Sequence, residues 1–225
     1  MSPKGRQTAV SYIVLFLFLL ISGCGRSEVS QVSSDDIVDN RIMPLEFTDI
    51  DNHHAEQAVL QGLEMGLWIV PADGQFRPYD AASVRDFLTA LWIASGKPEE
   101  SIRTTGNTND DTTGAVSWAI SKGWVNKTAL DKPLTRQKAM NILYEHNGGV
   151  SGIEAMLTAV YDDGFLDSSE IPPKGKAALY WGFYNLLIRE TEPEKIDPNG
   201  AVSRGDMAEM LISYRNDFIE GTPTK

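Results

Sequence analysis

The stretch AVSRGDMAEML, residues 201–211, has the features of a helix start. Ser203 is a good N-cap, because its hydroxyl can accept a hydrogen bond from a first-turn amide that has no partner within the helix. Asp206, three residues on, can supply the acidic half of a capping box. The residues that follow at the spacing of one helical face are apolar: Met207, Met210, Leu211 and Tyr214. The stretch therefore predicts an amphipathic helix that begins directly after Ser203.

The same pattern occurs twice upstream. Ser83 is followed by Val84, Arg85 and Asp86, and Thr135 is followed by Arg136, Gln137 and Lys138. Apolar residues again occupy one face after each cap. Three caps of this kind, at positions 83, 135 and 203, indicate a tandem array of helical units with unequal lengths.

These three copies resemble S-layer homology repeats, whose second helix opens with a Thr-Arg-Ala-Glu-type motif. The family usually begins a repeat with Phe-x-Asp, found here at residues 47–49 and 165–167, and has Gly-x-Phe-x-Pro before the cap, found at residues 74–78. Pro198 precedes Ser203 by the same interval as Pro78 precedes Ser83. The second copy has no Phe-x-Asp, and the resemblance covers roughly residues 45 to 217.

The predicted fold class is mainly α, because no stretch alternates apolar and polar residues over five or more positions. The resemblance implies three helical repeats about a pseudo-threefold axis, with grooves between neighbouring repeats. Their predicted bounds are residues 45–99, 100–150 and 151–217, followed by a tail at 218–225. An extra helix is expected near residues 152–161, within the third unit.

The N-terminus has the pattern of an export signal. Lys4 and Arg6 precede an apolar run at residues 9–21, which is too short to span a bilayer comfortably, since a spanning helix needs about 20 residues. The run closes on Ile-Ser-Gly-Cys, which resembles a bacterial lipobox. We therefore expect a lipoprotein signal peptide at 1–23, lipid attachment at Cys24 and a flexible tether at 24–44. An ordinary signal peptide or a short membrane anchor are the alternatives.

Charge and cysteine content restrict the partners. The formal charge is −11, and removing residues 1–23 takes away Lys4 and Arg6 but no acid. So acidic a chain is a poor match for nucleic acid or for electrostatic adhesion to anionic lipid, and any anionic polymer must be held at local sites. Cys24 is the one cysteine, so the chain forms no internal disulfide.

The arginine at the first helical position is the main candidate for ligand binding. A helix N-terminus attracts anions, and a guanidinium can hold a carboxylate through two parallel hydrogen bonds. Members of the resembled family bind secondary cell-wall polymers, often with a pyruvate ketal, through the motif arginine. The resemblance assigns this role to Arg204 and Arg136. In the first copy Val84 takes the position and Arg85 follows it, turned by about 100° around the helix.

The remaining site candidates are the neighbours of these arginines and two tryptophans. The cap and acid positions complete the candidate motifs: Ser83, Asp86, Thr135, Ser203 and Asp206. Lys138 replaces the motif acid, which should weaken that helix start by roughly 0.5–1 kcal/mol. Trp118 and Trp181 could stack on a sugar face, or could belong to the core. The arginines could likewise be solvated charges or structural ion-pair partners.

We find no pattern of an enzyme. No histidine or cysteine spacing indicates a metal site, and no nucleophile elbow or phosphate loop is present, so no catalytic residue, metal or cofactor is predicted. The sequence leaves two hypotheses. In the first, an extracytoplasmic lipoprotein, anchored to the membrane through Cys24, binds an acidic cell-wall polysaccharide and links membrane and wall. In the second, a degenerate module of the same fold binds another envelope protein.

Overall fold

The computed structural model describes residues 46–98, 111–149 and 154–221. All of these residues belong to one compact unit, residues 42–225. The predicted signal peptide, Cys24 and the tether at 24–44 lie outside the described residues, as does the end of the predicted tail. Within the described part of the chain, no helix is long and apolar enough to cross a membrane.

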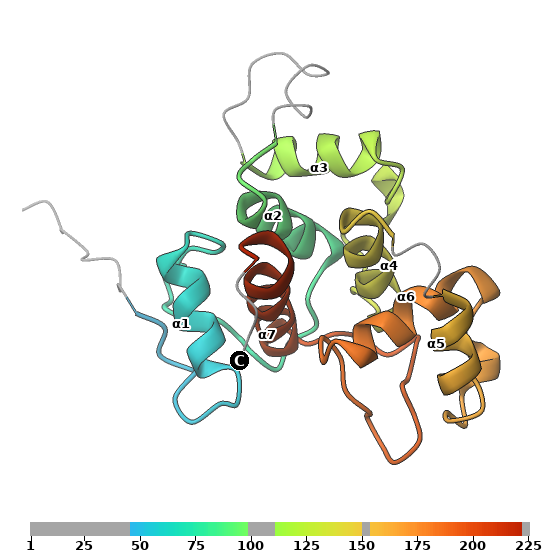
Figure 1. Ribbon diagram of the computed structural model, residues 1–225. Helices are drawn as coiled ribbons and strands as arrows, with labels where there is room; N and C mark the ends of the chain where they lie inside the picture. Colours follow the sequence, from blue (N-terminus) through green and yellow to red (C-terminus); the bar gives the residue numbers. More distant parts are fainter. Residues whose placement is uncertain (1–45, 99–110, 150–153, 222–225) are drawn as a thin grey trace, which may run out of the picture. The chain divides into compact units, whose positions relative to one another are not determined.

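The described residues are mainly helical, which confirms the predicted class (Figure 1). The α-helices in these ranges are α1 (Glu56–Glu64), α2 (Val84–Ala94), α3 (Asp111–Ser121), α4 (Arg136–His146), α5 (Glu154–Tyr161), α6 (Pro173–Tyr184) and α7 (Arg204–Tyr214). A π-helical turn, Arg215–Ile219, extends α7. Extended pairing in the described ranges consists of isolated bridges between residues, without a sheet.

All three predicted N-caps form. The Ser83, Thr135 and Ser203 side chains each accept from the amide three residues on, at 3.0, 3.2 and 3.0 Å. The box is complete at Ser83, whose amide donates to Asp86 at 3.5 Å. At the third cap the Ser203 hydroxyl donates to Asp206 Oδ2 at 2.7 Å. Lys138, in place of an acid, donates instead to the Trp124 carbonyl, and burial lowers its pKa.

The first amides of each capped helix donate to carbonyls of a distant segment. In α7, Arg204 and Gly205 donate to the carbonyls of Asp80 and Pro78 at 2.8 and 2.9 Å. The corresponding amides of α4 donate to Gly200 and Pro198, and those of α2 donate to Lys132 and Leu130. The main chain therefore already occupies the amides on which the predicted anion site depended.

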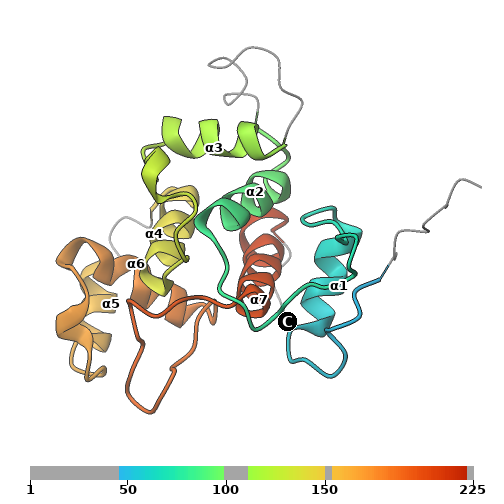
Figure 2. The same cartoon turned by 180° about the vertical axis from the view of Figure 1, so that it is seen from behind.

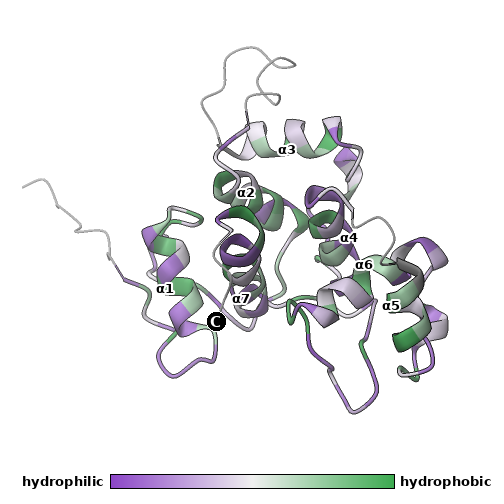
Figure 3. Ribbon diagram, in the orientation of Figure 1, coloured by the Kyte–Doolittle hydropathy of each residue, from purple (hydrophilic) through white to green (hydrophobic). Residues whose placement is uncertain are grey.

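Helix packing follows the same connections. Helix α2 packs against α3, α4 against α6, and α7 against α1, so that the last helix returns to the first (Figures 1 and 2). Helix α5 packs against α6. The bridges join the segments that precede the caps: Ser83 with Pro133, Thr135 with Ala201, and Ala81 with Ser203. Hydrophobic and hydrophilic bands alternate along the ribbon of α1, as expected for a helix that packs one face against α7 (Figure 3).

Five of the described helices, α1, α2, α3, α4 and α6, are followed by a residue with positive φ. After α1, Gly66 has φ 70° and the Leu67 amide donates to the Gly62 carbonyl, which is the Schellman pattern. Gly123 ends α3 in the same way. After α6 the position is held by Leu186, at φ 59° and 74% exposed. A non-glycine residue in this conformation is strained, because its Cβ crowds the following carbonyl oxygen.

The C-terminal parts of α2, α4 and α7 meet in a hydrogen-bonded chain through His146. Its Nδ1 lies 2.6 Å from the Tyr214 hydroxyl, its Nε2 lies 3.0 Å from Ser95 Oγ, and Ser95 in turn donates to the Leu91 carbonyl at 2.7 Å. These contacts are all satisfied when Tyr214 donates to a neutral imidazole whose Nε2 carries the hydrogen. Burial, with the positive charge of Lys122, lowers the pKa of His146.

We expect His146 to make stability depend on pH. Its folded pKa lies below the unfolded value of about 6.5, so the unfolded state binds the proton first. The contribution of neutral His146 to stability is therefore fully present above about pH 6.5 and is lost progressively as the pH drops below it. The midpoint temperature of thermal unfolding, expressed relative to its value at pH 8, should fall less between pH 8 and 5 in His146→Gln than in the unchanged protein. Equal losses in the two proteins would contradict this role. The carboxylates with lowered pKa do not interfere, because they change their contribution to stability below about pH 4, outside this range.

Candidate ligand-binding groove

An open groove of about 610 Å³ lies between α1, α7 and residues 186–191, and Arg136 reaches it from the start of α4. The α1 wall contributes Gln57 and Gln61, and the α7 wall contributes Asp206 and Glu209. Of the three predicted arginines, Arg136 lines this groove, and Arg204 and Arg85 do not. The groove therefore joins a motif arginine from one copy to the motif acid of the next.

Arg136 is held by one edge of its guanidinium. Nε donates to the Ile196 carbonyl at 2.6 Å, and Nη2 donates to the Arg189 carbonyl. Burial lowers the pKa of Arg136, and the negative charges of Asp197 and Asp206 oppose that effect. Nη1 has no protein partner in the described residues, so the end of the fork formed by Nη1 and Nη2 can still donate two parallel bonds to a ligand carboxylate.

Arg204 has a closed environment. Its Nε donates to the Phe76 carbonyl at 2.7 Å, its Nη1 lies 3.2 Å from Asp86 Oδ2, and its guanidinium lies over the Phe76 ring at 4.9 Å. Arg85 donates to Asp131 Oδ1 at 2.8 Å and lowers the pKa of that exposed carboxyl. For these two arginines, the contacts match the interpretation as structural ion-pair partners.

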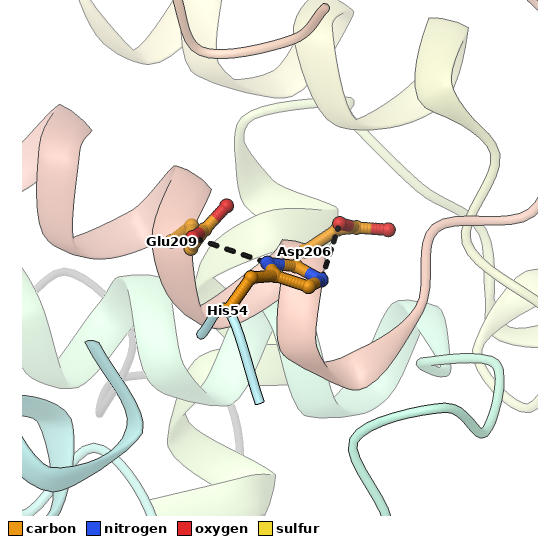
Figure 4. A group of neighbouring side chains, drawn as sticks. All are labelled: His54, Asp206 and Glu209. Atoms are coloured by element: carbon orange, nitrogen blue, oxygen red, sulfur yellow. Dashed lines mark ion pairs between the residues drawn. The ribbon is translucent and has the colours of Figure 1, made fainter. Parts of the chain in front are cut away.

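Three residues that could bind a metal ion also line the groove and lie close together: His54, Asp206 and Glu209 (Figure 4). The imidazole lies between the two carboxylates, with Nδ1 3.2 Å from Glu209 Oε1 and Nε2 3.8 Å from Asp206 Oδ1. Asp206 was predicted as a cap partner, whereas His54 and Glu209 were not predicted as site residues. Asp206 and Glu209 are three residues apart, and this helical spacing was the available signal.

The tryptophans predicted for sugar stacking are buried. Trp118 and Trp181 are each 2% exposed, so neither presents a ring face to a ligand in this conformation. Trp118 packs edge-on to Trp124 and His146, with ring centroids 4.8 and 5.6 Å away. Their burial supports the core alternative. The apolar residues that line the groove are instead aliphatic ones: Ala58, residues 186–188 with the strained Leu186, Val202, Met210 and Ile212.

The residues that line the site include the fixed guanidinium of Arg136, three acidic residues, an imidazole, amide side chains and several apolar side chains. The site can bind an acidic, hydroxyl-rich molecule, because the guanidinium pairs with carboxylate while carboxylates and amides accept from hydroxyls. No protein-family model matches the chain, and no curated protein matches it.

Proposed function

We propose that this chain is a non-enzymatic cell-envelope lipoprotein that binds an acidic cell-wall polysaccharide in the groove beside Arg136. The membrane attachment in this proposal rests on the lipobox-like sequence before Cys24. The observation that carries the ligand class is the Arg136 guanidinium, which is held on one edge by two carbonyls and open on the other. An oriented fork of this kind suits a carboxylate such as a pyruvate ketal.

We further propose that residues 45–217 are three degenerate S-layer homology repeats about a pseudo-threefold axis. Two features support this. The capped helices pack in cyclic order, α2 on α3, α4 on α6 and α7 on α1. The Phe-x-Asp copies also make equivalent bonds: Asp49 accepts from the amides of Phe76 and Arg77, and Asp167 accepts from those of Ile196 and Asp197.

In this arrangement the motif arginine of one repeat faces the motif acid of the next. Arg204 is closed by Asp86, whereas Arg136 and Asp206 line one groove and make no ion pair with each other among the described contacts. In the remaining pair, Val84 and Lys138 have replaced the arginine and the acid. One groove therefore retains the groups and the space that an acidic sugar requires.

The second hypothesis, a module that binds another envelope protein, is favoured by the closed state of Arg204. A protein that had kept its fold but lost its ligand would retain arginines as structural partners of backbone carbonyls. The two hypotheses differ in the expected ligand, so a wall-binding experiment separates them.

The test is co-sedimentation of residues 25–225 with purified native wall sacculi, before and after chemical removal of the secondary polymer. Arg136→Lys should weaken pelleting about 10- to 100-fold, because it keeps the charge and loses the fork, worth roughly 1.5–3 kcal/mol. Arg85→Lys, an arginine outside the groove, is the matched control, and thermal unfolding checks the fold of both. Absence of pelleting with intact walls would support the protein-partner hypothesis instead.

A further inference from the structure

We propose that His54, Asp206 and Glu209 form a binding site for a divalent transition-metal ion such as Zn²⁺. One nitrogen of His54 and one oxygen from each carboxylate lie within 4.8 Å of one another. These three residue types are common ligands of Zn²⁺, and three protein ligands with an open position are typical of zinc sites that also hold water or a ligand. This inference is independent of the proposed polysaccharide.

The two acids are already oriented towards the histidine. The Ser203 hydroxyl donates to Asp206 Oδ2 at 2.7 Å, which leaves Oδ1 as the oxygen that faces His54. Glu209 lies one helical turn further along α7, and its Oε1 approaches the opposite side of the imidazole (Figure 4). Both acids thus present an oxygen from the same face of one helix, while the histidine comes from the segment before α1.

The spacing of the donors is close to that of a bound ion. Ligand distances of about 2.0–2.2 Å require donor atoms roughly 3–3.6 Å apart. The longest separation must therefore shrink by about 1.2–1.8 Å, and the imidazole must turn so that one nitrogen faces both carboxylates, which now lie beside different nitrogens. Rotamer changes can achieve this, because the side chains of His54 and Asp206 are 54% and 53% exposed and that of Glu209 is 31% exposed. With a neutral imidazole the cluster has two negative charges, which a divalent cation would balance.

The composition of the cluster selects the class of metal. An imidazole nitrogen favours Zn²⁺ and similar transition metals over Ca²⁺ and Mg²⁺, which prefer oxygen ligands. The position also matters, because the three residues line the same groove as Arg136. A bound ion would give this groove a second positive centre for an anionic ligand.

The test is calorimetric titration of the full-length protein in detergent with Zn²⁺ and, separately, Ca²⁺, together with Co²⁺ absorption. We expect one Zn²⁺ per chain, at least tenfold weaker binding in both His54→Ala and Glu209→Gln, and loss of the Co²⁺ ligand-field bands in His54→Ala. His146→Gln and Glu64→Gln, a histidine and an acid outside the cluster, should bind like the unchanged protein.

Equal Zn²⁺ affinity in His54→Ala and the unchanged protein would overturn the site. So would Ca²⁺ binding as tight as Zn²⁺ binding and insensitive to His54, since that is the behaviour of a generally acidic surface. Because no sugar is present in this titration, its failure leaves the polysaccharide proposal to be judged by co-sedimentation alone.

Discussion

Replacing Asp49 with asparagine is expected to lower the free energy of unfolding by about 2–3 kcal/mol. The two carboxylate oxygens accept from the amides of Phe76 and Arg77, each at 2.7 Å. An asparagine keeps one acceptor and turns an NH₂ group towards the other amide, so a charge-assisted bond worth roughly 1.5–3 kcal/mol is lost and a donor is left without a partner. Urea unfolding followed by circular dichroism measures the change.

Asp51→Asn is the matched control, because it makes the same chemical change at an exposed acid two residues away. Its effect should stay within about 0.5 kcal/mol. Asp167→Asn should resemble Asp49→Asn with a smaller loss, since Asp167 accepts from Ile196 at 3.2 Å and from Asp197 at 2.7 Å. Similar stabilities of Asp49→Asn and Asp51→Asn would show that the Phe-x-Asp carboxylate does not hold the segment before the cap.

The reason for the large effect is positional. Asp49 fixes the segment at 76–78, the Phe76 carbonyl of this segment accepts from Arg204, and its Pro78 carbonyl accepts from the Gly205 amide. The carboxylate therefore supports the packing of the last helix against the first part of the chain. This connection also explains why a short motif far from the caps accompanies them in the sequence.

Local patterns predicted the helix starts well, because capping depends on residues close in sequence. Ser83, Thr135 and Ser203 all cap as expected, and Arg136 and Arg204 are the first residues of their helices. Helix α3 begins at Asp111, although Thr112, Thr113 and Gly114 are weak helix formers. Its packing against α2 outweighs that propensity.

The candidate groove could not be predicted to the same extent, because its walls come from distant parts of the chain. The motif identified Arg136, but its free edge depends on the carbonyls of Ile196 and Arg189. Likewise, nothing near His54 in the sequence indicates Asp206 and Glu209. The expected helix-terminus anion site also depended on unoccupied amides, and these amides donate to carbonyls of a segment whose approach was not evident from the sequence.

Gly62→Ala is expected to destabilise the protein by about 2 kcal/mol, although alanine favours a helix by about 1 kcal/mol over glycine. A Cβ on Gly62 would lie 2.0 Å from Cζ2 and 2.3 Å from Cη2 of Trp68. The indole cannot move aside without cost, because its Nε1 donates to the Val59 carbonyl at 2.8 Å and its ring packs against Phe76. Overpacking of about 1–3 kcal/mol and a lost hydrogen bond therefore exceed the helical gain.

The cause can be isolated with a double-mutant cycle in urea unfolding. In a Trp68→Ala background the contact is absent, so adding Gly62→Ala should be neutral or slightly stabilising, and Gln61→Ala controls for helix propensity in α1. A loss of the same size in both backgrounds would show that the Trp68 ring is not the obstacle. Gly62 belongs to the helix that provides Gln57 and Gln61 to the groove, so the close fit of glycine to indole also sets the position of that wall.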